Sequence, residues 1–79
     1  YPNPFNPITN ISYSIKDAGL VNIKVFDLLG QQVAELVNEE KEAGYYSITF
    51  DASKLPSGIY LYTINSRSFI QTRKMLLMK

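Results

Sequence analysis

The sequence contains no cysteine and no histidine among its 79 residues. The missing cysteines exclude disulfide bridges and thiol nucleophiles, and the missing histidines exclude imidazole bases and the commonest transition-metal ligand. A catalytic site would have to be built from Asp, Glu, Lys, Ser or Tyr alone, so we expect neither an enzyme nor a bound cofactor. Thiol-free proteins occur in every compartment, so this composition is compatible with export without requiring it.

The chain also lacks long apolar runs and a strong net charge. No apolar run approaches the ~18 residues of a membrane-spanning helix, so we predict no membrane insertion. The formal net charge of +1 provides no field that would recruit nucleic acid. The sequence begins at Tyr1 without an initiator methionine or a signal peptide, and we interpret it as a fragment of a larger protein.

Alternating apolar residues predict the fold. With 46% hydrophobic residues, the chain is large enough for one small domain with one core. Period-two alternation predicts half-buried strands over residues 10–15, 21–25 and 46–50. Residues 59–64 are apolar on both faces, which is typical of a central strand covered on both sides, and residues 69–79 predict a last strand. We therefore predict an all-β domain, a small immunoglobulin-like antiparallel β-sandwich of about seven strands.

The segments between these strands are less regular. In residues 32–37, the apolar positions Val33, Leu36 and Val37 fit a bulged strand, and they fit a helix as an alternative. Residues 38–44 predict a charged loop that ends in glycine. In the long connection from residue 51 to residue 58, Leu55 is expected to close one end of the core.

Proline dominates the start of the chain. Three of the four prolines fall within the first seven residues, where they exclude a helix interior and a central strand. We predict an extended entry arm over residues 1–8, docked on a sandwich formed by residues 9–79.

Particular residue types predict turns and packing. Gly30 and Gly58 are expected to satisfy turn geometry, and Asp27 and Asp51 to bond to nearby backbone. Large aromatic side chains dominate small cores. The aromatic residues assigned to the core on this basis are Tyr60 and Tyr62.

Four motifs, in their order along the chain, carry a family resemblance. They are Tyr1-Pro2-Asn3-Pro4-Phe5-Asn6-Pro7, Val25-Phe26-Asp27-Leu28-Leu29-Gly30-Gln31, Leu55-Pro56-Ser57-Gly58-Ile59-Tyr60 and Lys74-Met75-Leu76-Leu77-Met78-Lys79. With them the whole chain resembles the C-terminal sorting domain of the type IX (Por) secretion system. The positions to which we assign a structural role in these motifs and the turns are Pro2, Asn3, Pro4, Phe5, Asn6, Pro7, Gly30, Gly44, Gly58 and Tyr60.

The resemblance implies a function as well as a fold. Members are immunoglobulin-like domains that direct an upstream cargo of Gram-negative bacteria across the outer membrane, and they are not catalytic. The implied partners are the upstream cargo in the same chain, the outer-membrane machinery and a sortase-like peptidase that removes the domain in many members. The implied location is the cell surface or the medium, reached through the periplasm.

The last strand is the predicted recognition site. An edge strand with unpaired backbone groups and positive charge suits capture by strand addition to a receptor sheet, although lysines on an edge strand also guard against aggregation. The resemblance favours recognition. The residues assigned to it are Arg73, Lys74, Met75, Leu76, Leu77, Met78 and Lys79.

A second interpretation is a structural spacer or a carbohydrate-binding or adhesion module, because one sandwich fold supports many roles. Its support would be an exposed row formed by Tyr1, Tyr45 or Phe69. A third interpretation is an enzyme with a carboxylate pair drawn from Glu35 and Glu42.

A calcium site would need a loop dense in oxygen ligands. The available carboxylates, Asp17, Asp27 and Asp51, do not form such a loop in the sequence, so we expect no metal.

Overall fold

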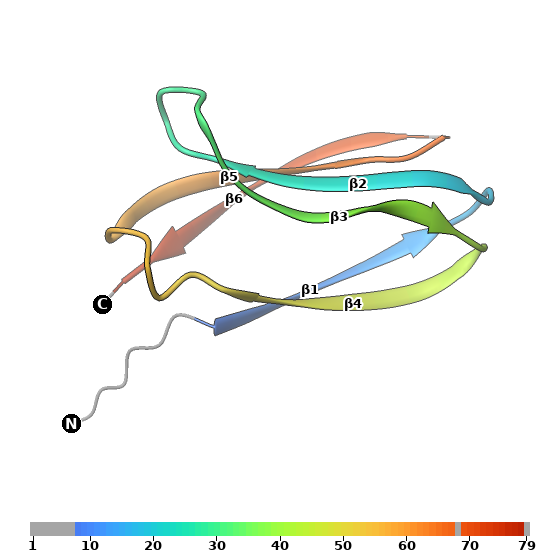
Figure 1. The fold of residues 1–79 in the computed structure, drawn as a ribbon, viewed down its shortest axis with the longest axis horizontal. Coiled ribbons are helices and arrows are strands. Elements are labelled where there is room, and N and C mark those ends of the chain that lie inside the picture. Colours follow the sequence, from blue (N-terminus) through green and yellow to red (C-terminus); the bar gives the residue numbers. More distant parts are fainter. Residues whose placement is uncertain (1–7, 68, 79) are drawn as a thin grey trace.

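Six antiparallel strands in two layers form the domain. The computed structural model describes residues 8–67 and 69–78. The strands are β1 (Ile8–Ile15), β2 (Gly19–Phe26), β3 (Gln32–Lys41), β4 (Gly44–Asp51), β5 (Gly58–Asn65) and β6 (Ile70–Leu77). One sheet has the order β3-β2-β5-β6, and β1 pairs with β4 in a second sheet that stacks on it (Figure 1). The predicted β-sandwich is confirmed, with six strands instead of about seven because the smaller layer has only two.

The predicted entry arm falls almost entirely outside the described residues. The exception is Ile8, which was assigned to the arm and is the first residue of β1. There it pairs with Asp51 of β4. The sandwich therefore includes Ile8, which the prediction assigned to the arm.

The core lies between the two sheets and uses the predicted alternating positions. Residues paired across strands share a face, so Ile23 of β2 meets Val37 of β3 and Ile64 of β5 on the core side. The largest of the almost completely buried side chains are Val21, Ile23, Val25 and Ile64. Each contributes about 1.5–3 kcal/mol through burial, which is substantial in a domain of this size.

β3 is longer than the sequence predicted. The bulged strand over residues 32–37 is confirmed and the helical alternative is wrong, with register shifts opposite Ile23/Lys24 and Val25/Phe26. The charged loop predicted for residues 38–44 is shorter than predicted, because β3 continues to Lys41 and β4 begins at Gly44. Its polar residues remain in the strand since their backbone pairs with the start of β2, where Gly19 faces Lys41.

β5 is central in its sheet, as predicted, but only one of its faces is covered. On the core side Tyr60 is buried, Tyr62 is half-buried, and the Tyr60 hydroxyl donates a hydrogen bond of 2.7 Å to the carbonyl of Pro56. On the opposite side Ile59 is 39% exposed. The prediction of a strand covered on both sides is wrong because β1 and β4 lie over one side only.

A tight loop joins β2 to β3. The Asp27 carboxylate accepts hydrogen bonds from the backbone N–H groups of Leu29 and Gln31 at 2.9 and 3.0 Å, as expected for an Asx turn. Gly30 has a φ of 86°, which side chains with a Cβ rarely adopt. A Cβ at Gly30 would meet nothing within 4 Å, so backbone strain alone requires glycine there.

Gly30→Ala is therefore expected to destabilise the domain by about 1–2 kcal/mol, measured by urea denaturation. Gly30→Asn is the matched control and should cost less, because asparagine tolerates positive φ better than alanine. Equal stability of Gly30→Ala and the wild type would contradict the assigned role of this turn.

Candidate functional site

The last strand occupies a free edge of the larger sheet. β6 pairs with β5 along its whole length, and no strand formed by residues 8–67 or 69–78 lies on its other side. β6 ends at the same end of the molecule at which β1 begins (Figure 1). An edge of this kind presents backbone N–H and C=O groups to an incoming strand.

Two residues fix β6 to the core. Leu77 is buried and Met75 is half-buried against the same cluster, so both face inward as the alternation predicted. Arg73 lies on the same side, opposite Tyr62, but it is exposed. The side chains in the first half of β6 are thus exposed, whereas Met75 and Leu77 in its second half are packed.

Positive charge on β6 is not neutralised within the described structure. Arg73 and Lys74 are exposed on opposite faces, and neither forms an ion pair with another described residue. The opposite edge of the same sheet, β3, carries Glu35, Glu39 and Glu40. The two free edges of this sheet therefore differ in charge, one acidic and one basic.

The outer face beside β6 is apolar, a feature that the sequence reasoning missed. Leu61 pairs with Phe26 on one side and Lys74 on the other, and Ile59 pairs with Leu76. We call Phe26, Ile59, Leu61 and Leu76 the outer apolar patch. Leu76 is 62% exposed. Contiguous exposed apolar groups next to a free edge are typical of an interaction surface.

The predicted recognition residues that the structure describes are thus of two kinds, those exposed to solvent and those packed against the core. Arg73 and Lys74 offer charge, Leu76 joins the outer apolar patch, and Met75 and Leu77 pack inward. Met78 follows β6 and is 68% exposed. Lys79 and the motif residues Pro2, Asn3, Pro4, Phe5, Asn6 and Pro7 lie outside the described residues.

The other motif residues are placed at element boundaries and in the core. Gly44 and Gly58 are the first residues of β4 and β5, each with a φ of 155°, and Gly30 lies in the turn before β3. Tyr60 is buried. The structure thus places these four residues in positions that shape the fold.

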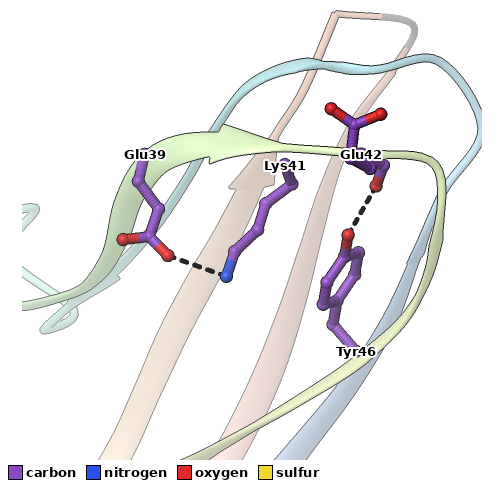
Figure 2. A network of polar contacts seen from close by, with 4 residues as sticks. All are labelled: Glu39, Lys41, Glu42 and Tyr46. Atoms are coloured by element: carbon purple, nitrogen blue, oxygen red, sulfur yellow. Dashed lines mark hydrogen bonds and ion pairs between the residues drawn. The ribbon is translucent and has the colours of Figure 1, made fainter.

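A cluster of polar and aromatic contacts lies where β3 passes to β4. Lys41 Nζ lies 2.7 Å from Glu39 Oε1 and 5.0 Å from the centre of the Tyr46 ring. The Tyr46 hydroxyl donates a hydrogen bond of 2.6 Å to the Glu42 carbonyl (Figure 2). Tyr46 also stacks on Tyr13, with ring centres 5.5 Å apart. These contacts hold the crossover between the two sheets.

This cluster predicts a loss of stability at alkaline pH. Burial raises the pKa of Tyr13, and the hydrogen bond to Glu39 raises the pKa of Lys41. Both groups hold their protons more tightly in the folded state, so their contribution is complete below pH ~10 and is lost as pH rises further. Urea denaturation between about pH 8 and pH 11 should show this decline.

Tyr13→Phe should make that decline shallower, because its ring cannot ionise. The control is Tyr45→Phe, which removes one exposed phenol from the same region. An equal decline in Tyr13→Phe and the wild type would show that Tyr13 has no part in it.

The candidate carboxylate pair is not assembled. Glu35 and Glu42 are separated by seven positions along an extended chain, or ~20 Å, well beyond the roughly 5–10 Å between glycosidase carboxylates. Among residues 8–67 and 69–78, no three His, Cys, Asp or Glu side chains are placed to hold a metal ion. In the same part of the chain no helix is long and apolar enough to cross a membrane.

Two of the three carboxylates considered for calcium, Asp27 and Asp51, use their oxygen atoms locally. Asp27 caps its own turn, and the Asp51 carboxylate accepts a hydrogen bond from the Ser53 N–H at 3.0 Å. That bond lowers the pKa of Asp51. Asp17 lies in the turn between β1 and β2 and belongs to no such group.

Comparison with known proteins gives one match. Residues 1–78 match the model of a family described as the secretion system C-terminal sorting domain. Neither the curated proteins nor the solved structures gave a match to the chain.

Proposed function

The chain belongs to the family of secretion system C-terminal sorting domains, and from this we propose that β6 is the element that the secretion machinery reads. The family is a sorting signal for type IX secretion. The signal implies a cargo upstream, contact with the secretion machinery, and a protein that is secreted or held at the cell surface. What remains to be assigned is the surface through which the machinery makes contact.

The observation that carries the proposal is the state of β6. It is a free edge with exposed cations, and its packed second half keeps it in register with β5. A receptor strand paired along this edge would satisfy the open backbone groups. Arg73 and Lys74 would attract carboxylates on that strand and speed its approach.

The outer apolar patch extends this surface. A receptor strand added to β6 would continue the sheet, and its outward side chains would lie beside Leu76 and Ile59. Backbone pairing contributes affinity but little specificity, whereas side-chain contacts distinguish partners. The patch and the two cations together supply such contacts.

The remaining parts of the proposal concern how the domain is linked to its cargo, exported and removed. We infer that the proline-rich residues before β1 form the link to the cargo and that residues 8–79 form the folded label, and that the label has no catalytic activity. The protein reaches the machinery from the periplasm, and a sortase-like peptidase removes the domain after transport. Removal would cut before β1, where cleavage leaves the sandwich intact.

A fusion tests the proposal. Residues 1–79 are attached to a passive periplasmic reporter in a bacterium that has the type IX system. We expect the reporter at the surface or in the medium, and we expect it to stay in the periplasm of a strain that lacks the machinery. A reporter that stays in the periplasm of both strains would reject the proposal.

A further inference from the structure

The outer face of the β1–β4 sheet differs from the rest of the surface. Four pairs of residues face outward on it, and the pair at one end is Ile8 with Asp51. The other three pairs, Asn10 with Thr49, Ser12 with Ser47, and Ser14 with Tyr45, are hydroxyl or amide side chains with no charge. Thr49 donates a hydrogen bond of 2.8 Å to the Asn10 side chain. This face lies on the opposite side of the sandwich from the outer apolar patch.

Tyr45 stands out on this face. It is 92% exposed, the most exposed of the large hydrophobic side chains among the described residues. A tyrosine left in water contributes little to folding, since its stabilising effect depends on burying the ring. No packing role in the described structure explains it.

Two open hollows meet at Tyr45. One of about 420 Å³ is lined by Ser12, Tyr13, Ser14, Tyr45 and Tyr46. The other, of about 280 Å³, is lined by Ser14, Ile15, Lys16, Gly44 and Tyr45. Tyr45 and Ser14 line both, so neighbouring units of a chain-like ligand could occupy successive hollows. Because Gly44 has no side chain, the second hollow stays open next to the ring.

The backbone beneath Tyr45 is held in place. The adjacent Tyr46 is fixed by its hydrogen bond to Glu42, its stacking on Tyr13 and the Lys41 ammonium near its ring. A rigid platform loses less conformational entropy on binding than a mobile one. The exposed ring therefore stands on an ordered strand.

These features fit one class of ligand. A pyranose has an apolar C–H face, which stacks on an aromatic ring, and a rim of neutral hydroxyl groups that exchange hydrogen bonds with serine and amide side chains. Tyrosine with serine and glycine is a combination that supplies rigid contact area and adaptable hydrogen bonds. Nucleic acid fits poorly, because among the described residues Lys16 is the only cation that lines either hollow.

We propose that this face binds a neutral oligosaccharide, with one sugar stacked on Tyr45 and hydroxyl contacts to Ser12, Ser14 and Ser47. The predicted row of exposed aromatics is not what carries this site: Phe69 is half-buried against the core, and Tyr1 lies outside the described residues. The proposal is independent of β6, which lies in the other sheet. It gives the domain a second activity, adhesion to a polysaccharide.

Nuclear magnetic resonance titration of the 79-residue chain tests this site. The probes are cellohexaose, xylohexaose, laminarihexaose and mannohexaose, and a bacterial O-polysaccharide, at concentrations above the roughly millimolar Kd that suits one stacking contact. We expect shifts confined to residues 12–14 and 44–47. Binding of the O-polysaccharide alone would point to a bacterial surface, and binding of a hexaose to an external polysaccharide.

Variants separate the site from unspecific binding. Tyr45→Ala should weaken binding at least about tenfold, and Tyr45→Phe should stay within about twofold because the stacking ring remains. Leu76→Ala, which removes an exposed apolar residue from the other sheet, should change nothing. Absence of shifts with all five probes, shifts elsewhere, or equal binding by Tyr45→Ala would overturn the proposal.

Discussion

Replacing Arg73 and Lys74 together by glutamate is expected to lower delivery of an attached reporter about tenfold while the domain stays folded. Both side chains are exposed and form no ion pair with another described residue, so their replacement removes no contact that stabilises the sandwich. The reversal would place like charges against a receptor that attracts cations, which slows association and raises its free energy. Quantifying the reporter in medium and periplasm measures the effect.

A matched variant controls for net charge. Lys16→Glu with Lys54→Glu changes the charge by the same amount at exposed positions that do not belong to β6, and delivery should remain close to that of the wild type. Arg73→Lys with Lys74→Arg keeps the charge and should also be delivered. If the two glutamate pairs reduced delivery equally, the effect would belong to overall charge and the assignment of β6 would be wrong.

Ile64→Ala is expected to destabilise the domain by about 3 kcal/mol, because it leaves a cavity in the centre of the core. Ile64 is 2% exposed and lies on β5 between β2 and β6. A domain of this size has roughly 4–12 kcal/mol of total stability, so the loss is a large fraction. Thermal unfolding followed by circular dichroism should show a midpoint about 10–20 °C lower.

Ile70→Ala is the control for Ile64→Ala, since it makes the same chemical change at a side chain that is 69% exposed. Its stability should lie within about 0.5 kcal/mol of the wild type. A loss in Ile70→Ala as large as in Ile64→Ala would mean that burial between the sheets does not govern stability here.

Alternation along the chain was sufficient to predict the strands that face the core. A strand covered on one side requires apolar residues at every second position, and β1 and β2 follow this rule with Ile11, Ile15, Val21 and Val25 inward. β4 follows it with Phe50. The strands and their buried side chains were therefore predictable, because burial of one face requires an apolar residue at each inward position.

The end of β3 was not predictable in this way. Glu39 and Glu40 were predicted to lie in a loop because consecutive charged residues do not show the apolar alternation of a strand. Their backbone nevertheless pairs with Val21 and Leu20. That pairing is long-range, and no local signal encodes it. The ion pair of Glu39 with Lys41 forms only once the strand exists.

Coverage of β5 shows a second limit. Ile59, Leu61 and Ile64 suggested burial on both faces, but sequence pattern cannot distinguish a face covered by another layer from an apolar face left open. The structure has only two strands in the second layer, so the outer apolar patch remains exposed. An exposed apolar surface was therefore read as core.

The candidate site was predictable in part. The inward direction of Met75 and Leu77 followed from the alternation of the last residues, and the position of β6 at an edge was predicted from the cations that it carries. The exposure of Arg73 on the core-facing side did not, because it depends on whether another part of the fold packs over that position. The hydroxyl face around Tyr45 required the register of β1 with β4, which joins residues far apart in the sequence.

Site-specific photo-crosslinking during export tests the central claim most directly. A photoreactive amino acid is placed at Thr72 on β6 or at Asn38 on β3, both exposed residues at opposite edges of the same sheet. We expect Thr72 to crosslink to a component of the secretion machinery and Asn38 to give little product. Crosslinking from Asn38 and not from Thr72 would contradict recognition through β6.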